Sequence, residues 1–271
     1  MRIDKFYSYI ENFGAWILAI LWISPLLYAF WAAFHPAEYA TSFELFAPLT
    51  LDNFKLALEQ APLLRYSLNT FILVSVLLLA QMIVSVLAAY AFARFEFFGH
   101  KVMFAFVLVQ LMITPEILIV ENYATLSELG LVDTITGIGL PYVASAFGIF
   151  LLRQAFKTSP KELEDAARLE GCGVMCTLWR VYIPLAKPTL LAYGLVSVSY
   201  HWNNFLWPLV VSNSVETRPL TVGLAIFGAP ESGVDWSVIS AATLFSVAPL
   251  LIAFLLFQRQ FVQSFMHAGI K

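Results

Sequence analysis

Long apolar blocks without formal charges alternate with short polar breaks along this chain. Five blocks contain no Asp, Glu, Lys or Arg, and a sixth, residues 102–120, is interrupted only by Glu116. The five uncharged blocks are residues 14–34, 66–93, 134–152, 188–215 and 236–258. Because a transmembrane helix needs roughly 20 apolar residues, each block is long enough to cross a bilayer. The pattern predicts an all-α integral membrane protein with six transmembrane helices.

Composition supports this class, since 60% of the 271 residues are hydrophobic and 12% are charged. Soluble globular chains average about 45–50% apolar and about 25% charged residues. We expect helices at about residues 13–34, 67–94, 102–122, 134–156, 186–211 and 236–262. Small residues such as Gly148 in the fourth helix predict close helix–helix approach. The polar break 35–65 predicts a short amphipathic helix near residues 51–58.

Lys and Arg residues are distributed unevenly between alternate polar breaks. If the first break is cytoplasmic, 12 of the 15 basic residues lie inside and only Lys55, Arg65 and Arg218 lie outside. Cytoplasmic loops of membrane proteins carry an excess of Lys and Arg. The distribution therefore predicts a multi-pass protein with both termini in the cytoplasm.

The predicted organisation has no soluble domain, because every connection between blocks is short. We expect a cytoplasmic N-terminus at residues 1–12, and then the first transmembrane helix with its external loop at 13–65. A transmembrane core follows at 66–262, with a cytoplasmic insert at 157–184. A cytoplasmic tail at 263–271 ends the chain.

The insert, residues 157–184, is the longest charge-dense run between two apolar blocks. Ser159 and Glu162 have the spacing of a capping box, and Pro160 suits the first helical position. Gly171 is typical of the residue just after a helix C-terminus. These signals predict a helix over about residues 160–170, with alanines on one face, and a second short helix over about 173–182.

The order of residues in the insert resembles a known family pattern. Asp165-Ala166-Ala167, Gly171, Val181 and Ile183-Pro184 are similar to Glu-Ala-Ala-x3-Gly-x9-Ile-x-Leu-Pro, the EAA motif of binding-protein-dependent ABC importer permeases. Asp165, Val181 and Ile183 depart from the pattern conservatively. Further matches resemble the smaller permease of carbohydrate importers, as in the maltose and glycerol-3-phosphate systems: Leu68-Asn69, Pro115-Glu116, Trp202-Asn203, Leu206-Trp207-Pro208 and residues 258–263.

This resemblance implies a type I importer permease that forms half of a translocation pathway in the bacterial cytoplasmic (inner) membrane. The insert would be the coupling helix that docks on a separate ATP-hydrolysing subunit. The implied partners are a second homologous permease, two ATP-binding subunits, a substrate-binding protein and a sugar or sugar derivative. The implied coupling residues are Glu162, Glu164, Asp165, Ala166, Ala167 and Gly171.

The chain itself lacks the Gly-x4-Gly-Lys-Ser/Thr loop that holds nucleotide phosphates. We therefore expect no catalytic residue, no metal site and no cofactor in this chain, with ATP and Mg bound by the partner ATPase. Its four His residues are scattered at positions 35, 100, 201 and 267, which disfavours a membrane enzyme. A self-contained secondary transporter or channel is the alternative, although its usual chain of intramembrane charges is missing.

Polar residues inside the apolar blocks are the candidates for the substrate pathway. Aromatic rings pack on sugar rings, and amides bond to hydroxyl groups. The candidates are Tyr200, His201, Trp202, Asn203, Asn204, Trp207, Glu116 and Gln110. Anchoring at the membrane interface is the alternative role for the aromatic residues. For Glu116 the alternative is a structural role at the break made by Pro115.

Cys172 and Cys176 lie four residues apart in the insert. Disulfides are rare in reducing compartments, and two thiolates without a nearby His are too few for a structural zinc site. We expect both cysteines to be free and to have a structural role only.

Overall fold

The structure is a computed structural model that describes residues 2–40, 44, 47–228 and 234–269. The described residues form helices and connecting turns, with no β-strand among them. The chain divides into two compact units. The first comprises Met1–Leu64 and Gly223–Pro249, and the second comprises Arg65–Val222 and Leu250–Lys271.

The first unit is built from the N-terminal helix and the external loop. It contains α1 (Arg2–Ala33), α2 (Ala37–Ala40), α3 (Asp52–Gln60), the 3-10 segment η4 (Ala225–Gly228) and the beginning of α15 (Trp236–Gly269). The buried Asn53 side chain donates to the carbonyls of Ala33 (3.0 Å) and His35 (2.8 Å). Asn53 thereby satisfies carbonyl groups at the end of α1, and the predicted helix near residues 51–58 is confirmed as α3.

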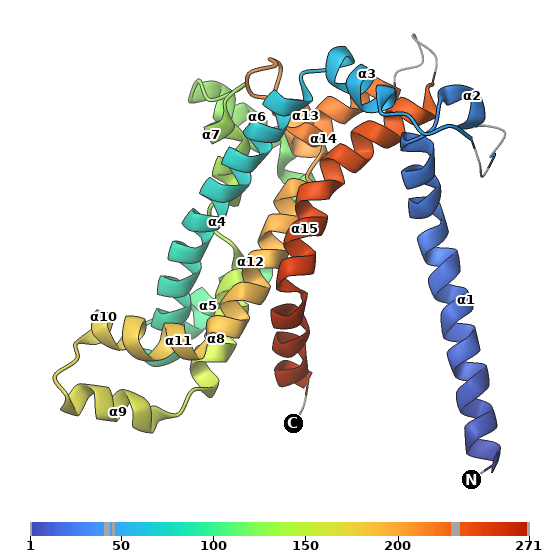
Figure 1. Ribbon diagram of the computed structural model, residues 1–271. Helices are drawn as coiled ribbons and strands as arrows, with labels where there is room; N and C mark the ends of the chain where they lie inside the picture. The colour runs from blue at the N-terminus through green and yellow to red at the C-terminus, as the bar shows by residue number, and fades with distance from the viewer. Residues whose placement is uncertain (1, 41–43, 45–46, 229–233, 270–271) are drawn as a thin grey trace. The chain divides into compact units, whose positions relative to one another are not determined.

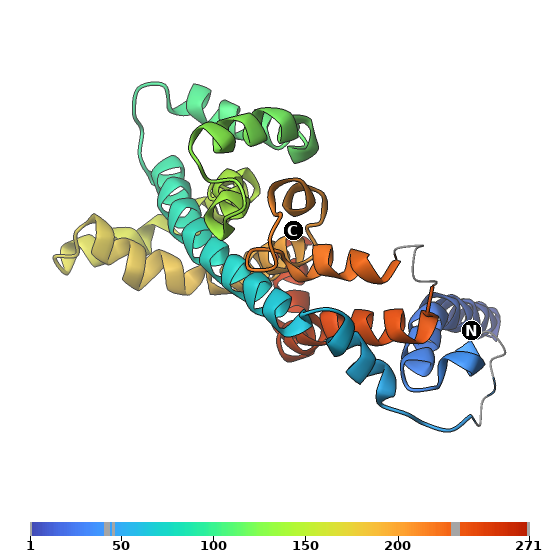
Figure 2. The same ribbon diagram turned by 90° about the horizontal axis from the view of Figure 1, so that it is seen from above.

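The second unit contains most of the remaining helices. In chain order they are α4 (Leu63–Arg94), α5 (His100–Gln110), η1 (Pro115–Leu118), α6 (Ile119–Glu128), α7 (Ile135–Gly139), η2 (Leu140–Tyr142), α8 (Ala146–Thr158), α9 (Lys161–Leu169), α10 (Val174–Thr177), η3 (Leu178–Tyr182), α11 (Ile183–Leu185), α12 (Lys187–Trp202), α13 (Leu206–Val211) and α14 (Leu220–Leu224). α8 packs against both α5 and α12, and α13 packs against α6 and α7. Figures 1 and 2 both show the insert at the C-terminal end of α4.

Six candidate membrane spans are present among the described residues if each bent pair of helices counts as one. Three spans are continuous: Asn12–Ala33, Leu63–Arg94 and Trp236–Leu256. The other three are bent: His100–Gln110 with Pro115–Glu128 by 91°, Ile135–Tyr142 with Ala146–Thr158 by 47°, and Val174–Leu185 with Lys187–Trp202 by 77°. The predicted all-α class is confirmed, and the described helices supply between three and six candidate spans.

The third, fourth and fifth predicted helices, at residues 102–122, 134–156 and 186–211, are each divided in the structure. Pro115 and Pro141 lack the N–H that would continue a helical ladder, and the chain bends near each of them. Ser145 then starts α8 anew, because its hydroxyl accepts the Gly148 N–H at 3.1 Å. The fifth span ends at Trp202, and residues 203–205 separate it from α13.

Close packing in the second unit depends on Gly148. A Cβ atom there would lie 2.5 Å from Tyr193 Cζ and 2.7 Å from Ser85 Oγ. No side chain larger than a hydrogen atom fits without moving one of these neighbours. The glycine therefore permits the close approach between α8 and α12 that was predicted from its small size.

One apolar cluster connects the insert to the rest of the second unit. It contains Val86, Ala89 and Tyr90 of α4, Leu152 and Phe156 of α8, Leu178 and Tyr182 of η3, and Ala186. Phe156 and Tyr182 are fully buried. This packing fixes the base of the insert against two long helices.

Candidate functional sites: the insert and the α12 cavity

The insert folds as a helical hairpin. Figure 1 shows α9 and the α10–α11 segment running in opposite directions beyond the end of α4. Gly171, with φ +81°, makes the turn that follows α9. The Cys172 N–H donates to the Ala167 carbonyl (2.9 Å) and the Gly171 N–H to the Arg168 carbonyl (3.0 Å). These two bonds form a Schellman motif, so the predicted helix terminator at Gly171 is confirmed.

The predicted capping box at the start of this helix is wrong. α9 begins at Lys161 without a side-chain cap. The Ser159 hydroxyl instead donates back to the Ala155 carbonyl (3.1 Å), at the end of α8. Because α8 runs as far as Thr158, its unpaired carbonyl competes for the serine hydroxyl. Glu162 is exposed and lies in the first turn of α9, where the helix dipole favours its charge.

Glu164 anchors α9 to the second unit. Its side chain is only 10% exposed; it accepts from Arg168 at 2.6 Å, and Arg94 Nε lies 3.6 Å away. The Tyr182 hydroxyl also donates to this carboxylate. Burying a carboxylate requires such partners, because an unpaired charge would be strongly destabilising.

Arg94 holds three segments together at the C-terminal end of α4. Its Nη2 donates to the Ser159 carbonyl (2.6 Å), its guanidinium carbon lies 4.7 Å from the centre of the Tyr182 ring, and it pairs with Glu164. The side chain is 6% exposed. One arginine thus contacts the end of α8, the middle of α9 and the π-helical segment η3.

The other candidate coupling residues lie on the free side of α9. Asp165 and Ala166 are exposed, and Ala167 is half-buried. Leu169, which the sequence analysis did not single out, is 90% exposed at the end of the helix. An exposed leucine beside small alanines forms a surface that another protein can approach closely.

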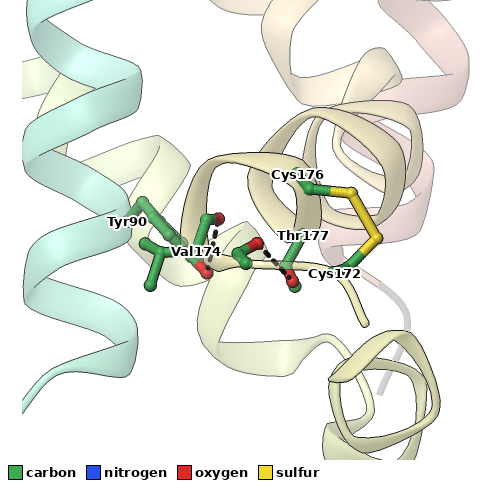
Figure 3. The surroundings of a disulfide bond; sticks show 6 residues. Tyr90, Cys172, Val174, Cys176 and Thr177 are labelled. Carbon is green, nitrogen blue, oxygen red and sulfur yellow. Dashed lines mark hydrogen bonds between the residues drawn. A yellow bond between two sulfur atoms is a disulfide. The ribbon is translucent and has the colours of Figure 1, made fainter. Parts of the chain in front are cut away.

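Cys172 and Cys176 are joined by a disulfide, so the expectation of free cysteines was wrong. Figure 3 shows the bond at the turn between α9 and α10. Gly171 and Gly173 on either side of Cys172 allow a turn that brings the two Cα atoms to 5.3 Å, a normal spacing for a disulfide. The expectation rested on the redox state of the compartment and not on this local geometry. The same view shows the Tyr90 hydroxyl donating to the Val174 carbonyl (3.4 Å). The Thr177 hydroxyl donates to the Gly173 carbonyl (3.1 Å).

A cavity of about 470 Å³ lies in the second unit, beside α12. We call it the α12 cavity; it is lined by Gln81, Gln110, Leu111, Ile113, Pro115, Leu118, Asn122, Pro141, Tyr142, Ala144, Ser145, Ala146, Phe147, Tyr193, Val196, Ser197, Tyr200 and His201. Its volume is in the range of small-molecule sites, which is about 300–1,000 Å³. The lining combines aromatic rings with amide and hydroxyl groups.

Three of the candidate pathway residues line this cavity: Gln110, Tyr200 and His201. Sequence reasoning missed Tyr142 and Tyr193, which meet Gln81 and His201 only in the folded chain. Gln81, a glutamine within an apolar block and so a weaker candidate from the sequence, also lines the cavity and is 3% exposed.

The remaining candidates lie elsewhere in the second unit. Trp207 is buried and donates from Nε1 to the Ile138 carbonyl (3.0 Å), within the cluster that joins α13 to α7. Trp202 is buried, while the Asn203 side chain donates to the Ser199 carbonyl (2.8 Å) at the end of α12. The Asn204 carbonyl accepts from Thr221 (2.8 Å). Glu116 is exposed, next to the cavity-lining Pro115.

Asp133 makes a second polar site at the opposite end of α4 from the insert. Its carboxylate accepts the N–H groups of Asn213 (2.8 Å) and Ser214 (3.0 Å) and the Thr217 hydroxyl. Desolvation would raise the pKa of Asp133, but these hydrogen bonds outweigh it and lower the pKa to about 2. The carboxylate therefore joins the α6–α7 turn to residues 213–217.

Comparison with known families identifies the kind of chain to which these sites belong. Residues 17–267 match the family of binding-protein-dependent transport system inner membrane components. The chain belongs to this family. It is therefore a permease component of a transport system, and the inner-membrane location of this family agrees with the prediction.

Named relatives align along nearly the whole chain. The arabinooligosaccharides transport system permease protein AraQ of Halalkalibacterium halodurans is 32% identical over 270 residues, covering 97% of this chain and 96% of AraQ. The sn-glycerol-3-phosphate transport system permease protein UgpE of Yersinia pestis is 30% identical over 264 residues, covering 91% and 93%. A crystal structure of a bacterial ABC transporter involved in alginate import has a TM-score of 0.86 at 23% identity, covering 96% of this chain and 98% of that chain. That structural match supports the predicted type I permease fold.

Proposed function

We propose that this chain is one permease subunit of a binding-protein-dependent ABC importer for a sugar or sugar derivative. Relatives whose names include arabinooligosaccharide and glycerol-phosphate transport support the substrate class. A second match, with a TM-score of 0.69, is to an alginate ABC transporter in complex with an alginate-bound periplasmic protein. It supports a binding protein as one partner of this chain.

The observation that carries the proposal is the two-sided construction of α9. One side is fixed to the second unit through Glu164, and the other presents Asp165, Ala166 and Leu169 to solvent. We infer that this free side docks on an ATP-binding subunit, which binds ATP and Mg. Two such subunits and a second homologous permease complete the importer, and this chain supplies half of the pathway without hydrolysing ATP itself.

The test is to express the chain with its partner subunits and measure their association and the ATPase activity of the purified complex. Ala166→Asp and Gly171→Asp should each reduce co-purification of the ATP-binding subunits, since the first adds a charge to the free side and the second strains a turn at φ +81°. Ala124→Asp, at an exposed position of α6, is the matched control. Unchanged association and unchanged coupling of ATP hydrolysis to uptake in both insert variants would contradict the proposal.

The orientation is also proposed, with both termini and the insert in the cytoplasm. It rests on the 12-to-3 distribution of Lys and Arg. A reporter that fluoresces only in the cytoplasm, fused after Lys271, should fluoresce in cells. A periplasmic phosphatase fused at the same place should be inactive, and the reverse result would invert the topology.

The alternative of a self-contained transporter makes a different prediction. Such a protein would carry out uptake when reconstituted alone, without ATP or a binding protein. We expect no uptake from this chain alone.

A further inference from the structure

A buried hydrogen-bond network lies at the wall of the α12 cavity, and Gln81 is its centre. Gln81 Nε2 donates to the Tyr142 carbonyl (2.6 Å) and lies 3.0 Å from His201 Nε2. Gln81 Oε1 accepts from the Tyr193 hydroxyl (3.0 Å) and the Ser197 hydroxyl (2.6 Å). All four positions of the amide are therefore used.

This network fixes the proton on the imidazole of His201. A backbone carbonyl only accepts hydrogen bonds, so the Gln81 atom facing the Tyr142 carbonyl is the amide nitrogen. The second hydrogen of that nitrogen points at His201 Nε2, which must then be the accepting nitrogen of a neutral ring. The proton of His201 is consequently on Nδ1.

His201 Nδ1 has no hydrogen-bond partner among the residues that the structure describes, whereas the ring itself is held firmly. Tyr142 and Tyr200 pack edge-on against the imidazole, each with ring centres 5.1 Å from it. His201 lines the α12 cavity. It can therefore offer the cavity one N–H donor from a side chain of fixed orientation.

The charge of the cavity restricts what it accommodates. None of its lining residues in the described part of the chain is Lys, Arg, Asp or Glu. The nearby formal charge is negative, since Glu116 follows the lining residue Pro115 and interacts electrostatically with Tyr142 and Tyr200. An anion in such a site would lose water without gaining a cation, which is costly in a medium of low polarity. Neutral hydroxyl groups are instead matched by the amide, phenol and imidazole groups.

We infer that the α12 cavity takes an uncharged carbohydrate, and that His201 donates a hydrogen bond from Nδ1 to one of its oxygens. Tyr200 and Phe147 supply aromatic surface for the C–H groups of a sugar ring. Gln81 acts as a positioning residue, because it selects the tautomer of His201 without needing to touch the sugar. This inference rests on the proposed importer function and names the class of its substrate.

The first experiment uses the complete importer in proteoliposomes with its binding protein. The neutral probe is an arabinose trisaccharide. The two anionic probes are glycerol 3-phosphate and an alginate trisaccharide. We expect ATP-dependent uptake of the neutral probe and at least tenfold slower uptake of both anions. Uptake of either anion as fast as the neutral probe would overturn the inference and leave the importer function intact. ATP-independent uptake, or no uptake of any carbohydrate, would contradict the proposed function itself.

The second experiment separates the donor from the network by substituting His201. In His201→Gln the side-chain oxygen reaches the place of Nε2 and accepts from Gln81, but the donor at Nδ1 is lost. We expect the KM for the neutral probe to rise about two- to twelvefold, the loss of one neutral hydrogen bond, with little change in kcat or in the melting temperature. Ser212→Ala is the control, because it removes a buried hydroxyl that bonds to the Pro208 carbonyl (2.6 Å) outside the cavity lining and should lower the melting temperature while leaving KM unchanged. A His201→Gln importer with wild-type KM would refute the role of Nδ1.

Discussion

Removing the Tyr182 hydroxyl should loosen α9 from the second unit without disturbing the packing beneath it. Tyr182→Phe keeps the fully buried ring in its cluster with Tyr90 and Phe156. It removes only the hydrogen bond to Glu164, whose carboxylate keeps its contacts with Arg168 and Arg94. The substitution therefore tests one bond between the insert and its base.

The size of the effect follows from the charge on the acceptor. A hydrogen bond to a charged group contributes about 1.5–3 kcal/mol, and each 1.4 kcal/mol changes an equilibrium constant tenfold. The equilibrium for local opening of α9 should rise about 10- to 100-fold. Amide hydrogen exchange at residues 164–169 should accelerate by the same factor, because exchange reports the population of the open state.

The matched control is Tyr90→Phe, which removes a hydroxyl from the neighbouring ring. The centres of the two rings are 5.1 Å apart, but the Tyr90 hydroxyl reaches only the neutral Val174 carbonyl, at 3.4 Å. This long bond contributes less than about 1 kcal/mol, so exchange in α9 should change by less than about fivefold. In the assembled importer, Tyr182→Phe should also lower the amount of substrate carried per ATP hydrolysed. If exchange in α9 is equal in the two variants, Glu164 is not the anchor that the geometry indicates.

Three other substitutions test separate parts of the structure. Gly148→Ala should destabilise the protein by about 1–3 kcal/mol, because the new Cβ would lie 2.5 Å from Tyr193 Cζ. Gly173→Ala, with open space at the same position, should leave the melting temperature in detergent unchanged; equal effects would contradict this packing account. Asn53→Ala should cost about 1–3 kcal/mol, measured in the same way, since two carbonyls lose their donor. Asp133→Asn should lower the melting temperature at pH 7. The difference in melting temperature between this variant and the wild type should shrink as pH falls from about 4 to 2. The depressed pKa of Asp133 means that its carboxylate stabilises the fold above its ordinary pKa of 3.8 and loses that effect as pH falls through about 2; a difference that is constant with pH would show that ionisation is not the cause.

Local signals made parts of this structure predictable. Apolar blocks, five of them charge-free, predicted the candidate spans because the bilayer imposes a minimum apolar length. Gly171 marked the end of α9 because only glycine adopts φ +81° without strain. Both features depend on a few consecutive residues, so neighbouring sequence was sufficient.

Features that depend on distant partners were not predictable in the same way. Ser159 looked like the cap of the helix that follows it, but the end of α8 competes for its hydroxyl. The role of Glu164 depends on Arg94, 70 positions earlier in the chain. His201 and Gln81 are separated by 120 positions and acquire their chemistry only when α12 packs on α4. The proposed coupling and pathway residues remain predictions for the experiments above.

The contacts of Arg94 with three segments have a mechanical consequence. A hairpin attached only by its two chain ends would bend when pushed, and the displacement would be lost in the connecting turns. Here the guanidinium reaches α8, α9 and η3 from the last residue of α4. A force applied to the exposed side of α9 is therefore delivered as torque to α4, whose 32 residues extend it along the second unit. Arg94 therefore adds to the apolar cluster beneath the insert a polar contact that resists bending at the end of a long helix.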